Sequence, residues 1–156
     1  TREWNPNSVP DPLSDRGKQE MYYTLYPHAG NRADAAVPRR TYECISSLIP
    51  LDAGSAKTDA SSSESFMELD PRNVILTTCK MAEDDKDAAI VRFYEAEARE
   101  NTDATLTLPR EVKDAQAVNF LEEPSDNISK ELSVDGRQIR LSMSKGEVVT
   151  LRITFK

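Results

Sequence analysis

Residues 135–155 read Asp-Gly-Arg-Gln-Ile-Arg-Leu-Ser-Met-Ser-Lys-Gly-Glu-Val-Val-Thr-Leu-Arg-Ile-Thr-Phe, and this stretch decides the fold class. Apolar side chains alternate with polar ones on both sides of a turn at residues 145–147, at Ile139, Leu141, Met143, Val149, Leu151, Ile153 and Phe155. Alternation with a period of two predicts two half-buried antiparallel strands. Asp135-Gly136 supplies the positive φ angles of a two-residue hairpin turn and predicts another strand before it.

The same alternation marks shorter segments upstream, with turn signals about 8 to 12 residues apart. Strands are expected at residues 66–69, 74–81, 89–94, 105–108, 117–121 and 128–134. The run from Glu83 to Asp87 predicts a hairpin with an acidic tip. Residues 93–99 have good helix propensity but are too few to stand alone, so we expect a loop or one turn there. The pattern predicts an all-β fold, an antiparallel β-sandwich.

The front of the chain carries most of its prolines, which disfavours long helices there. Residues 19–26 are rich in aromatic and β-branched types and end at Pro27, which predicts a strand. Residues 41–45 are a weaker candidate strand, and residues 48–51 predict an edge or final strand. Residues 53–65 contain no large apolar side chain and predict a linker or mobile loop.

Composition excludes several classes of protein. The chain has 156 residues and a net charge of −7, which disfavours a nucleic-acid partner. It has no apolar run long enough for a membrane span. Cys44 and Cys79 are far apart and there is one histidine, so we expect two small buried thiols rather than a disulfide scaffold or zinc ribbon. The start at Thr1, without a signal segment, suggests an excised piece of a longer chain.

Carboxylates are the first candidates for chemistry. Glu122 and Glu123 are adjacent and precede Pro124, so we expect a solvated loop rather than a catalytic pair facing one cleft. The acidic run from Glu83 to Asp87 lacks the spacing of a calcium loop, and a solvated turn is the default interpretation.

Aromatic residues and the single histidine are the second candidates. His28 has no nucleophile or carboxylate arranged locally as a partner, which favours a structural or interface role. Trp4, Tyr22, Tyr23 and Tyr26 could form a sugar-stacking platform, with core packing and burial at a domain interface as the alternatives. The residues alone therefore predict no catalytic, cofactor-binding or metal-binding side chain.

Four strings follow one another along the chain. Asp15-Arg16-Gly17 opens a segment that ends in Leu25-Tyr26-Pro27-His28-Ala29-Gly30. The later strings are Cys79 to Asp84 followed by Ile90 to Ala96, then Val118 to Pro124, and finally Glu147 to Arg152. In this order they resemble the C-terminal β region of glycoside hydrolase family 38 α-mannosidases, over nearly the whole chain except the Ser-rich stretch.

The resemblance implies a parent enzyme that hydrolyses terminal α-mannosides of glycans by a retaining mechanism. Its carboxylates and a divalent metal, usually zinc, would belong to a barrel domain outside this chain, which would itself be inactive and hold no cofactor. Residues 1–52 would be closing strands of the central β-sandwich, residues 53–65 a linker, and residues 66–156 a small C-terminal sandwich.

The resemblance also implies partners. These are the catalytic barrel and helical domains of the parent, mannose-containing glycans, and further copies if the parent is a homo-oligomer. Low-ranking candidates for a cleft or sugar contact are His28, Tyr26, Tyr23 and Trp4. The alternative is an independent carbohydrate-binding or adhesion-like module. If a barrel normally covers this region, the side chains of Met21, Tyr23 and Leu25 should be unusually exposed.

Overall fold

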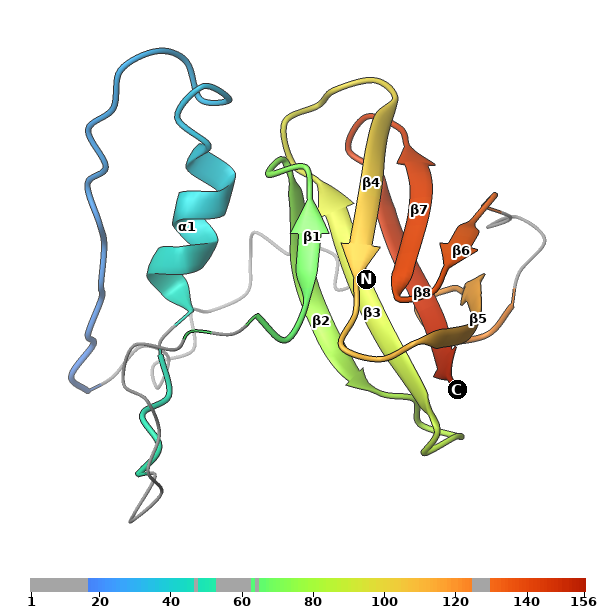
Figure 1. The fold of residues 1–156 in the computed structure, drawn as a ribbon. Helices are drawn as coiled ribbons and strands as arrows, with labels where there is room; N and C mark the ends of the chain where they lie inside the picture. The colour runs from blue at the N-terminus through green and yellow to red at the C-terminus, as the bar shows by residue number, and fades with distance from the viewer. Residues whose placement is uncertain (1–16, 47, 53–62, 64, 125–129) are drawn as a thin grey trace, which may run out of the picture.

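The computed structural model describes residues 17–46, 48–52, 63, 65–124 and 130–156. They form one helix and two four-stranded antiparallel sheets packed face to face (Figure 1). The elements are α1 Val37–Ile45, β1 Glu68–Asp70, β2 Val74–Met81, β3 Ala88–Glu95, β4 Thr102–Thr107, β5 Val112–Ala117, β6 Ser133–Asp135, β7 Gln138–Met143 and β8 Val148–Phe155. The sheet orders are β1-β4-β7-β6 and β2-β3-β8-β5. The predicted all-β antiparallel sandwich is confirmed.

The core lies between the two sheets. β7 and β8 bury the alternating apolar residues that the sequence predicts, with Ile139, Leu151 and Ile153 fully buried. Phe93 and Val91 of β3 and Leu106 of β4 complete the centre of the same cluster. Each such side chain contributes about 1.5–3 kcal/mol when it leaves water. The apolar side chains of the period-two pattern therefore supply most of the surface that is buried between the two sheets.

Two predicted hairpins are confirmed. β6 and β7 pair with Asp135 opposite Gln138, and Gly136 in their turn has a φ of 58°. β2 and β3 pair from Val74 opposite Glu95 to Met81 opposite Ala89, with the acidic run of residues 83–87 at the tip. The strand β3 ends at Glu95, and residues 96–101 form a loop, as expected for the short helix-prone run.

The expected position of one strand, residues 117–121, was wrong. The strand lies at Val112–Ala117 rather than at residues 117–121. β5 is an edge strand, and its residues Lys113, Asp114 and Gln116 are polar and exposed, so little apolar alternation marks it in the sequence. Residues 119–122 turn back instead, because the Asn119 side chain accepts hydrogen bonds from the Leu121 and Glu123 N–H groups at 2.8 and 3.0 Å.

The N-terminal part departs most from the sequence-based expectations. Residues 41–45 belong to the helix α1, not to a strand. Pro38 fits the first turn of a helix, and Arg39 and Arg40 pair with Glu43 one turn later. Residues 19–26 are extended, but no strand is assigned to them or to the other described residues before 68. A β-prone sequence alone does not make a strand when no partner strand lies beside it.

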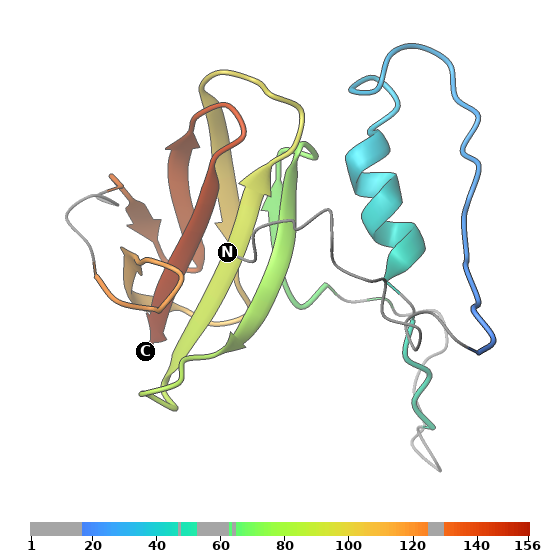
Figure 2. The same ribbon diagram turned by 180° about the vertical axis from the view of Figure 1, so that it is seen from behind.

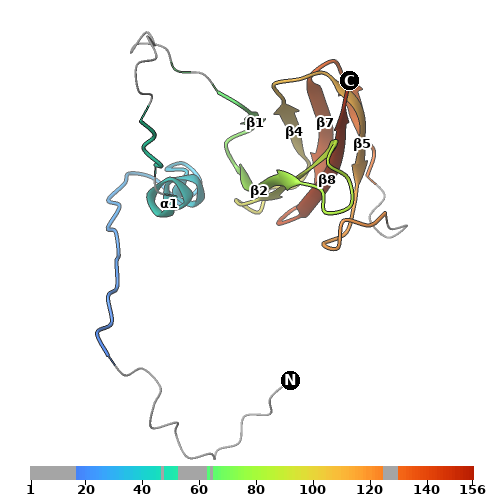
Figure 3. The same cartoon turned by 90° about the horizontal axis from the view of Figure 1, so that it is seen from below.

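Three parts of the structure follow one another in sequence order: the extended segment, the helix α1 and the two-sheet sandwich. α1 lies beside the sandwich, near β1 and β2, and the extended segment runs along the far side of α1 (Figures 1 and 2). The view from below shows the helix nearly end-on between these two parts (Figure 3). Tyr42 of α1 contacts Tyr94 of β3, with ring centroids 6.3 Å apart.

The expectation that both thiols are buried was also wrong. Cys44 and Cys79 are both free and exposed. Cys44 lies near the end of α1 and faces the extended segment, and Cys79 lies where the edge strand β2 leaves the core. In the described part of the chain, no helix is long and apolar enough to cross a membrane.

Candidate functional site

A groove separates the extended segment from α1. It has a volume of about 1000 Å³. Its lining comes from two segments of the chain. The extended segment contributes Tyr22, Tyr23, Thr24, Tyr26 and His28, and α1 contributes Val37, Arg40, Thr41, Cys44 and Ile45. This is within the range of ligand-binding pockets, about 300–1000 Å³.

Two contacts hold the walls of this groove together. The Thr24 hydroxyl lies 3.0 Å from the Cys44 sulfur, and the Tyr26 hydroxyl donates a 3.4 Å hydrogen bond to the Ala35 carbonyl. The rings of Tyr26 and His28 lie 5.6 Å apart and are tilted by 38°. Thr24, Tyr26 and His28 therefore share the face of the extended segment that looks toward the helix.

Charged side chains around the groove lie beside groups of opposite charge. Arg40 bonds Glu43 at 2.6 Å, and this carboxylate raises the pKa of the Arg40 guanidinium. Glu20 is paired with Lys18 and accepts a hydrogen bond from the Tyr22 hydroxyl at 3.2 Å. Lys18 first and Tyr22 second lower the pKa of Glu20. The groove is thus rich in hydrogen-bonding groups, and the guanidinium of Arg40 lies in its lining beside the Glu43 carboxylate.

The structure brings together three of the four site residues named from the sequence. Tyr23, Tyr26 and His28 all line the groove, and Trp4 lies outside the described residues. Sequence reasoning did not single out Arg40, and it missed Thr41 and Cys44 as lining residues because it assigned residues 41–45 to a strand. The spacing of Arg39 and Arg40 before Glu43 was the available signal for a helix.

The carboxylate candidates lie elsewhere and hold the sandwich together. The expected loop at residues 122–123 is present, but the Glu122 side chain is not solvated. It lies 2.5 Å from Lys80 and accepts a 3.0 Å hydrogen bond from the Glu83 N–H. These contacts, with Lys80 first, lower the pKa of Glu122. Asp84 at the hairpin tip pairs with Arg152 at 2.6 Å. No group of three or more His, Cys, Asp or Glu among the described residues could hold a metal ion.

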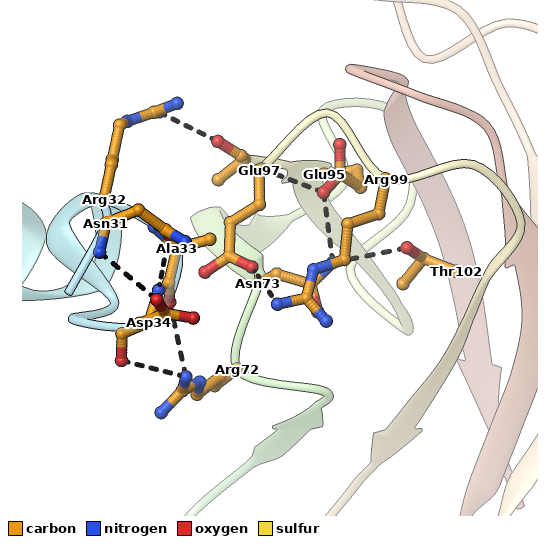
Figure 4. Close-up of polar contacts among 11 residues, drawn as sticks. Asn31, Arg32, Ala33, Asp34, Arg72, Asn73, Glu95, Glu97, Arg99 and Thr102 are labelled. Atoms are coloured by element: carbon orange, nitrogen blue, oxygen red, sulfur yellow. Dashed lines mark hydrogen bonds and ion pairs between the residues drawn. The ribbon is translucent and has the colours of Figure 1, made fainter.

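A second polar cluster joins the turn before α1 to the sandwich (Figure 4). The Arg72 guanidinium donates to the carbonyls of Ala33 and Asp34 at 3.3 and 3.1 Å. The Arg32 guanidinium donates to the Ala96 carbonyl at 2.9 Å. Two arginines from different parts of the chain therefore fix this turn, and with it one end of the groove, against the sandwich.

Near this polar cluster, the buried carboxylate of Glu95 is hydrogen-bonded to three loops. It accepts hydrogen bonds from the Asn73 side chain at 3.0 Å, the Glu97 N–H at 2.8 Å and the Gly146 N–H at 3.0 Å. Burial alone would raise the pKa of Glu95, but these donors and the Arg99 N–H lower it to about 2. The carboxylate is therefore ionised at neutral pH and acts as a structural acceptor.

Comparisons with known proteins agree with this fold. Residues 73–151, about half of the chain, match the glycosyl hydrolases family 38 C-terminal beta sandwich domain. The chain is 30% identical over 150 residues to alpha-mannosidase 2C1 of Homo sapiens and 28% identical over 150 residues to alpha-mannosidase 2C1 of Mus musculus. Each alignment covers 95% of this chain and 14% of the relative.

The resemblance drawn from the four strings is thereby confirmed. The matched range begins at Asn73 and ends at Leu151, and so it includes β2 to β7, the first part of β8 and both confirmed hairpins. The chain therefore belongs to the glycosyl hydrolase family 38 C-terminal beta sandwich domain family.

Proposed function

We propose that the chain is a non-catalytic β portion of a metal-dependent, retaining α-mannosidase, and that it supports a catalytic barrel made by other residues. The observation that carries the proposal is the 30% identity to a protein named alpha-mannosidase, over 95% of this chain but 14% of that protein. On this proposal, the nucleophile, the acid/base and a divalent metal such as zinc all belong to the remaining part of such an enzyme.

The exposed apolar side chains support this role. Met21, Tyr23 and Leu25 are 87%, 88% and 85% exposed, which agrees with the exposure expected for this face. Leu48, Ile49 and Leu51 are exposed in the same way. Solitary domains rarely leave so many large apolar groups in water. We propose that these two stretches are closing strands of a larger sandwich and pack against the rest of the enzyme.

A chimera tests the proposal. The region of human alpha-mannosidase 2C1 that aligns with this chain is replaced by this chain, and the comparison protein has the same region deleted. We expect the chimera to be more soluble than the deletion protein and to hydrolyse 4-nitrophenyl α-mannoside, because the sandwich covers an apolar face of the catalytic part.

The isolated chain provides the control and should show no hydrolysis with zinc or cobalt supplied. Hydrolysis by the isolated chain would contradict a non-catalytic role. A chimera that is as insoluble and inactive as the deletion protein would contradict the supporting role.

A further inference from the structure

We infer that the loop of residues 119–123, which we call the Phe120 loop, is a docking surface for the remaining part of the enzyme. Phe120 and Leu121 fill an apolar socket on that part, and the acidic side chains beside them meet basic residues at the rim of the socket. The identity of the partner rests on the proposed function. The presence of a docking surface rests on the loop itself.

The Phe120 loop holds two large apolar side chains in water. Phe120 is 67% exposed and Leu121 is 77% exposed. The backbone of the loop is fixed, because the Asn119 side chain accepts hydrogen bonds from the Leu121 and Glu123 N–H groups at 2.8 and 3.0 Å. The Asn119 N–H also donates to the Glu123 carbonyl at 2.9 Å. The exposure of the two apolar side chains therefore belongs to the folded conformation of the loop.

The loop is also fixed to the sheet β2-β3-β8-β5. The Glu122 carboxylate is largely buried and lies 2.5 Å from the Lys80 ammonium. The Arg92 guanidinium lies 4.4 Å from the centre of the Phe120 ring and donates a 2.9 Å hydrogen bond to the Thr150 hydroxyl. Apolar side chains that are already held in place lose little conformational entropy on binding, which is typical of the residues that dominate protein interfaces.

Acidic side chains lie beside this apolar pair. The hairpin tip between β2 and β3 contacts the Phe120 loop, because the Glu83 N–H donates a 3.0 Å hydrogen bond to the Glu122 carboxylate. The tip contains four acidic residues and one basic residue: Glu83, Asp84, Asp85, Asp87 and Lys86. Asp87 of the tip and Glu123 of the loop form no ion pair within the part of the chain that the structure describes. Unpaired negative charge therefore borders the exposed apolar pair.

These charges decide between two occupants of the surface. A second copy that docked through the same face would bring two acidic surfaces together, and like charges across an interface are unfavourable. A surface with an apolar socket and Lys or Arg at its rim complements both the apolar pair and the charges around it. The charge pattern therefore favours a basic surface of the remaining part of the enzyme.

The position of the loop agrees with this partner. Arg92 and Tyr94 are two residues apart in β3, so their side chains point to the same face of the sheet. Arg92 contacts Phe120, and Tyr94 contacts Tyr42 of α1. The Phe120 loop, in orange, and α1 are therefore on one face of this sheet (Figure 2). One part of the enzyme that packs on this face can contact both the loop and the extended segment beside α1.

The test compares hydrogen exchange in the isolated 156-residue chain and in the chimera with human alpha-mannosidase 2C1. We expect exchange in the peptide of residues 118–124 to slow by about tenfold or more in the chimera, because docking shields the loop from water. β7 is the internal reference, since it lies inside the other sheet and should exchange equally in both proteins.

The double variant Phe120→Ser, Leu121→Ser should return this exchange in the chimera to the rate of the isolated chain, because it removes both docking side chains. In the isolated chain the same variant should keep the melting temperature within about 4 °C of the parent, since both side chains are exposed and only the Arg92 contact is lost. Val134→Ser is the control, because it removes an exposed apolar side chain from β6 of the other sheet. It should leave the protection unchanged.

The variant Asp87→Lys tests the charge of the partner. We expect exchange of the loop in the chimera to become about threefold faster, because a positive charge is placed at a basic rim. Slower exchange in this variant would overturn the basic partner.

Three further outcomes would overturn the inference. An active chimera whose loop exchanges as fast as in the isolated chain would do so and leave the proposed function standing. An insoluble, inactive chimera would overturn both. Slower loop exchange in the isolated chain as its concentration rises would assign the surface to a second copy instead.

Discussion

Glu95 shows how one buried charge can organise several loops. Its carboxylate is 2% exposed and accepts hydrogen bonds from the loops before β2, after β3 and before β8. A buried carboxylate without donors would be strongly unfavourable, so these bonds both permit its burial and fix the loops. The same loops carry Ala96, which anchors Arg32 of the turn before α1.

Glu95→Gln should destabilise the sandwich at neutral pH. A folded-state pKa lowered from 4.5 to about 2 corresponds to roughly 3 kcal/mol of stability, present above pH 4.5 and lost as the pH falls through about 2. We expect urea unfolding to show this loss at pH 7 and a flatter dependence of stability on pH between 4.5 and 2. Glu68→Gln, at an exposed position of β1, is the control. Equal acid sensitivity of Glu95→Gln and the parent would contradict this role.

Asn119 shapes the loop that follows β5. Its side-chain oxygen receives the N–H groups of Leu121 and Glu123, and Glu122 takes a positive φ of 68° in this loop. Asn119→Ala should cost about 1–2 kcal/mol and speed hydrogen exchange at those two amides, since the donors lose their partner. Asn119→Asp keeps an acceptor and should retain most of the protection. Unchanged exchange in Asn119→Ala would show that the backbone alone sets the turn.

At the scale of elements, the stability of α1 depends on the turn that precedes it and on the hydrogen bonds that fix this turn to the sandwich. α1 has 9 residues, and a helix of this length is marginal in isolation. Tertiary contacts therefore decide its stability. The Arg72 and Arg32 hydrogen bonds to backbone carbonyls lie at the turn that starts it, and the Tyr42 and Tyr94 rings meet farther along.

Arg72→Ala should loosen this element without unfolding the sandwich. We expect faster hydrogen exchange at residues 35–40 and a change of less than about 0.5 kcal/mol in the stability of the sandwich, because Arg72 is an exposed residue and donates only to the turn. Arg39→Ala, an exposed arginine on the helix, is the control. Loss of sandwich stability in Arg72→Ala would show that the two parts unfold as one unit.

At the scale of the whole molecule, the chain combines a contiguous core in the sandwich with exposed apolar side chains on the extended segment. The sandwich has a contiguous core drawn from both sheets. The extended segment adds nothing to that core and exposes Met21, Tyr23 and Leu25. On the proposed function, the sandwich keeps its own core while the rest of the enzyme covers the exposed side chains of the extended segment.

Met21→Ser, Tyr23→Ser and Leu25→Ser together should reduce the exposed apolar surface without changing the core. We expect weaker fluorescence of a dye that binds apolar surface, less self-association, and a melting temperature of the sandwich within about 2 °C of the parent. Val134→Ser, in the exposed strand β6, is a single-site control. A marked drop in melting temperature of the triple variant would contradict the division into a core and an exposed extended segment.

The strongest strands could be predicted from the sequence because their pattern is local. In β7 and β8, alternation along a few consecutive residues is enough to bury one face, and Asp135-Gly136 supplies the turn before β7. The four strings likewise pointed to the family without any knowledge of contacts. Tyr23 and Tyr26 were singled out because aromatic residues crowd into one short segment, and His28 because it is the single histidine of the chain.

The remaining features depend on residues far apart in the chain. Residues 41–45 have β-prone side chains, yet they are helical because Arg32 and Arg72 hold the preceding turn on the sandwich and Tyr42 meets Tyr94. The buried position of Glu95 and the groove depend in the same way on contacts between distant segments. Sequence by itself therefore determined the sandwich, where burial follows a local period. Only the tertiary structure decided the helix, the turn before it and the groove, because their energies come from long-range contacts that no local period encodes.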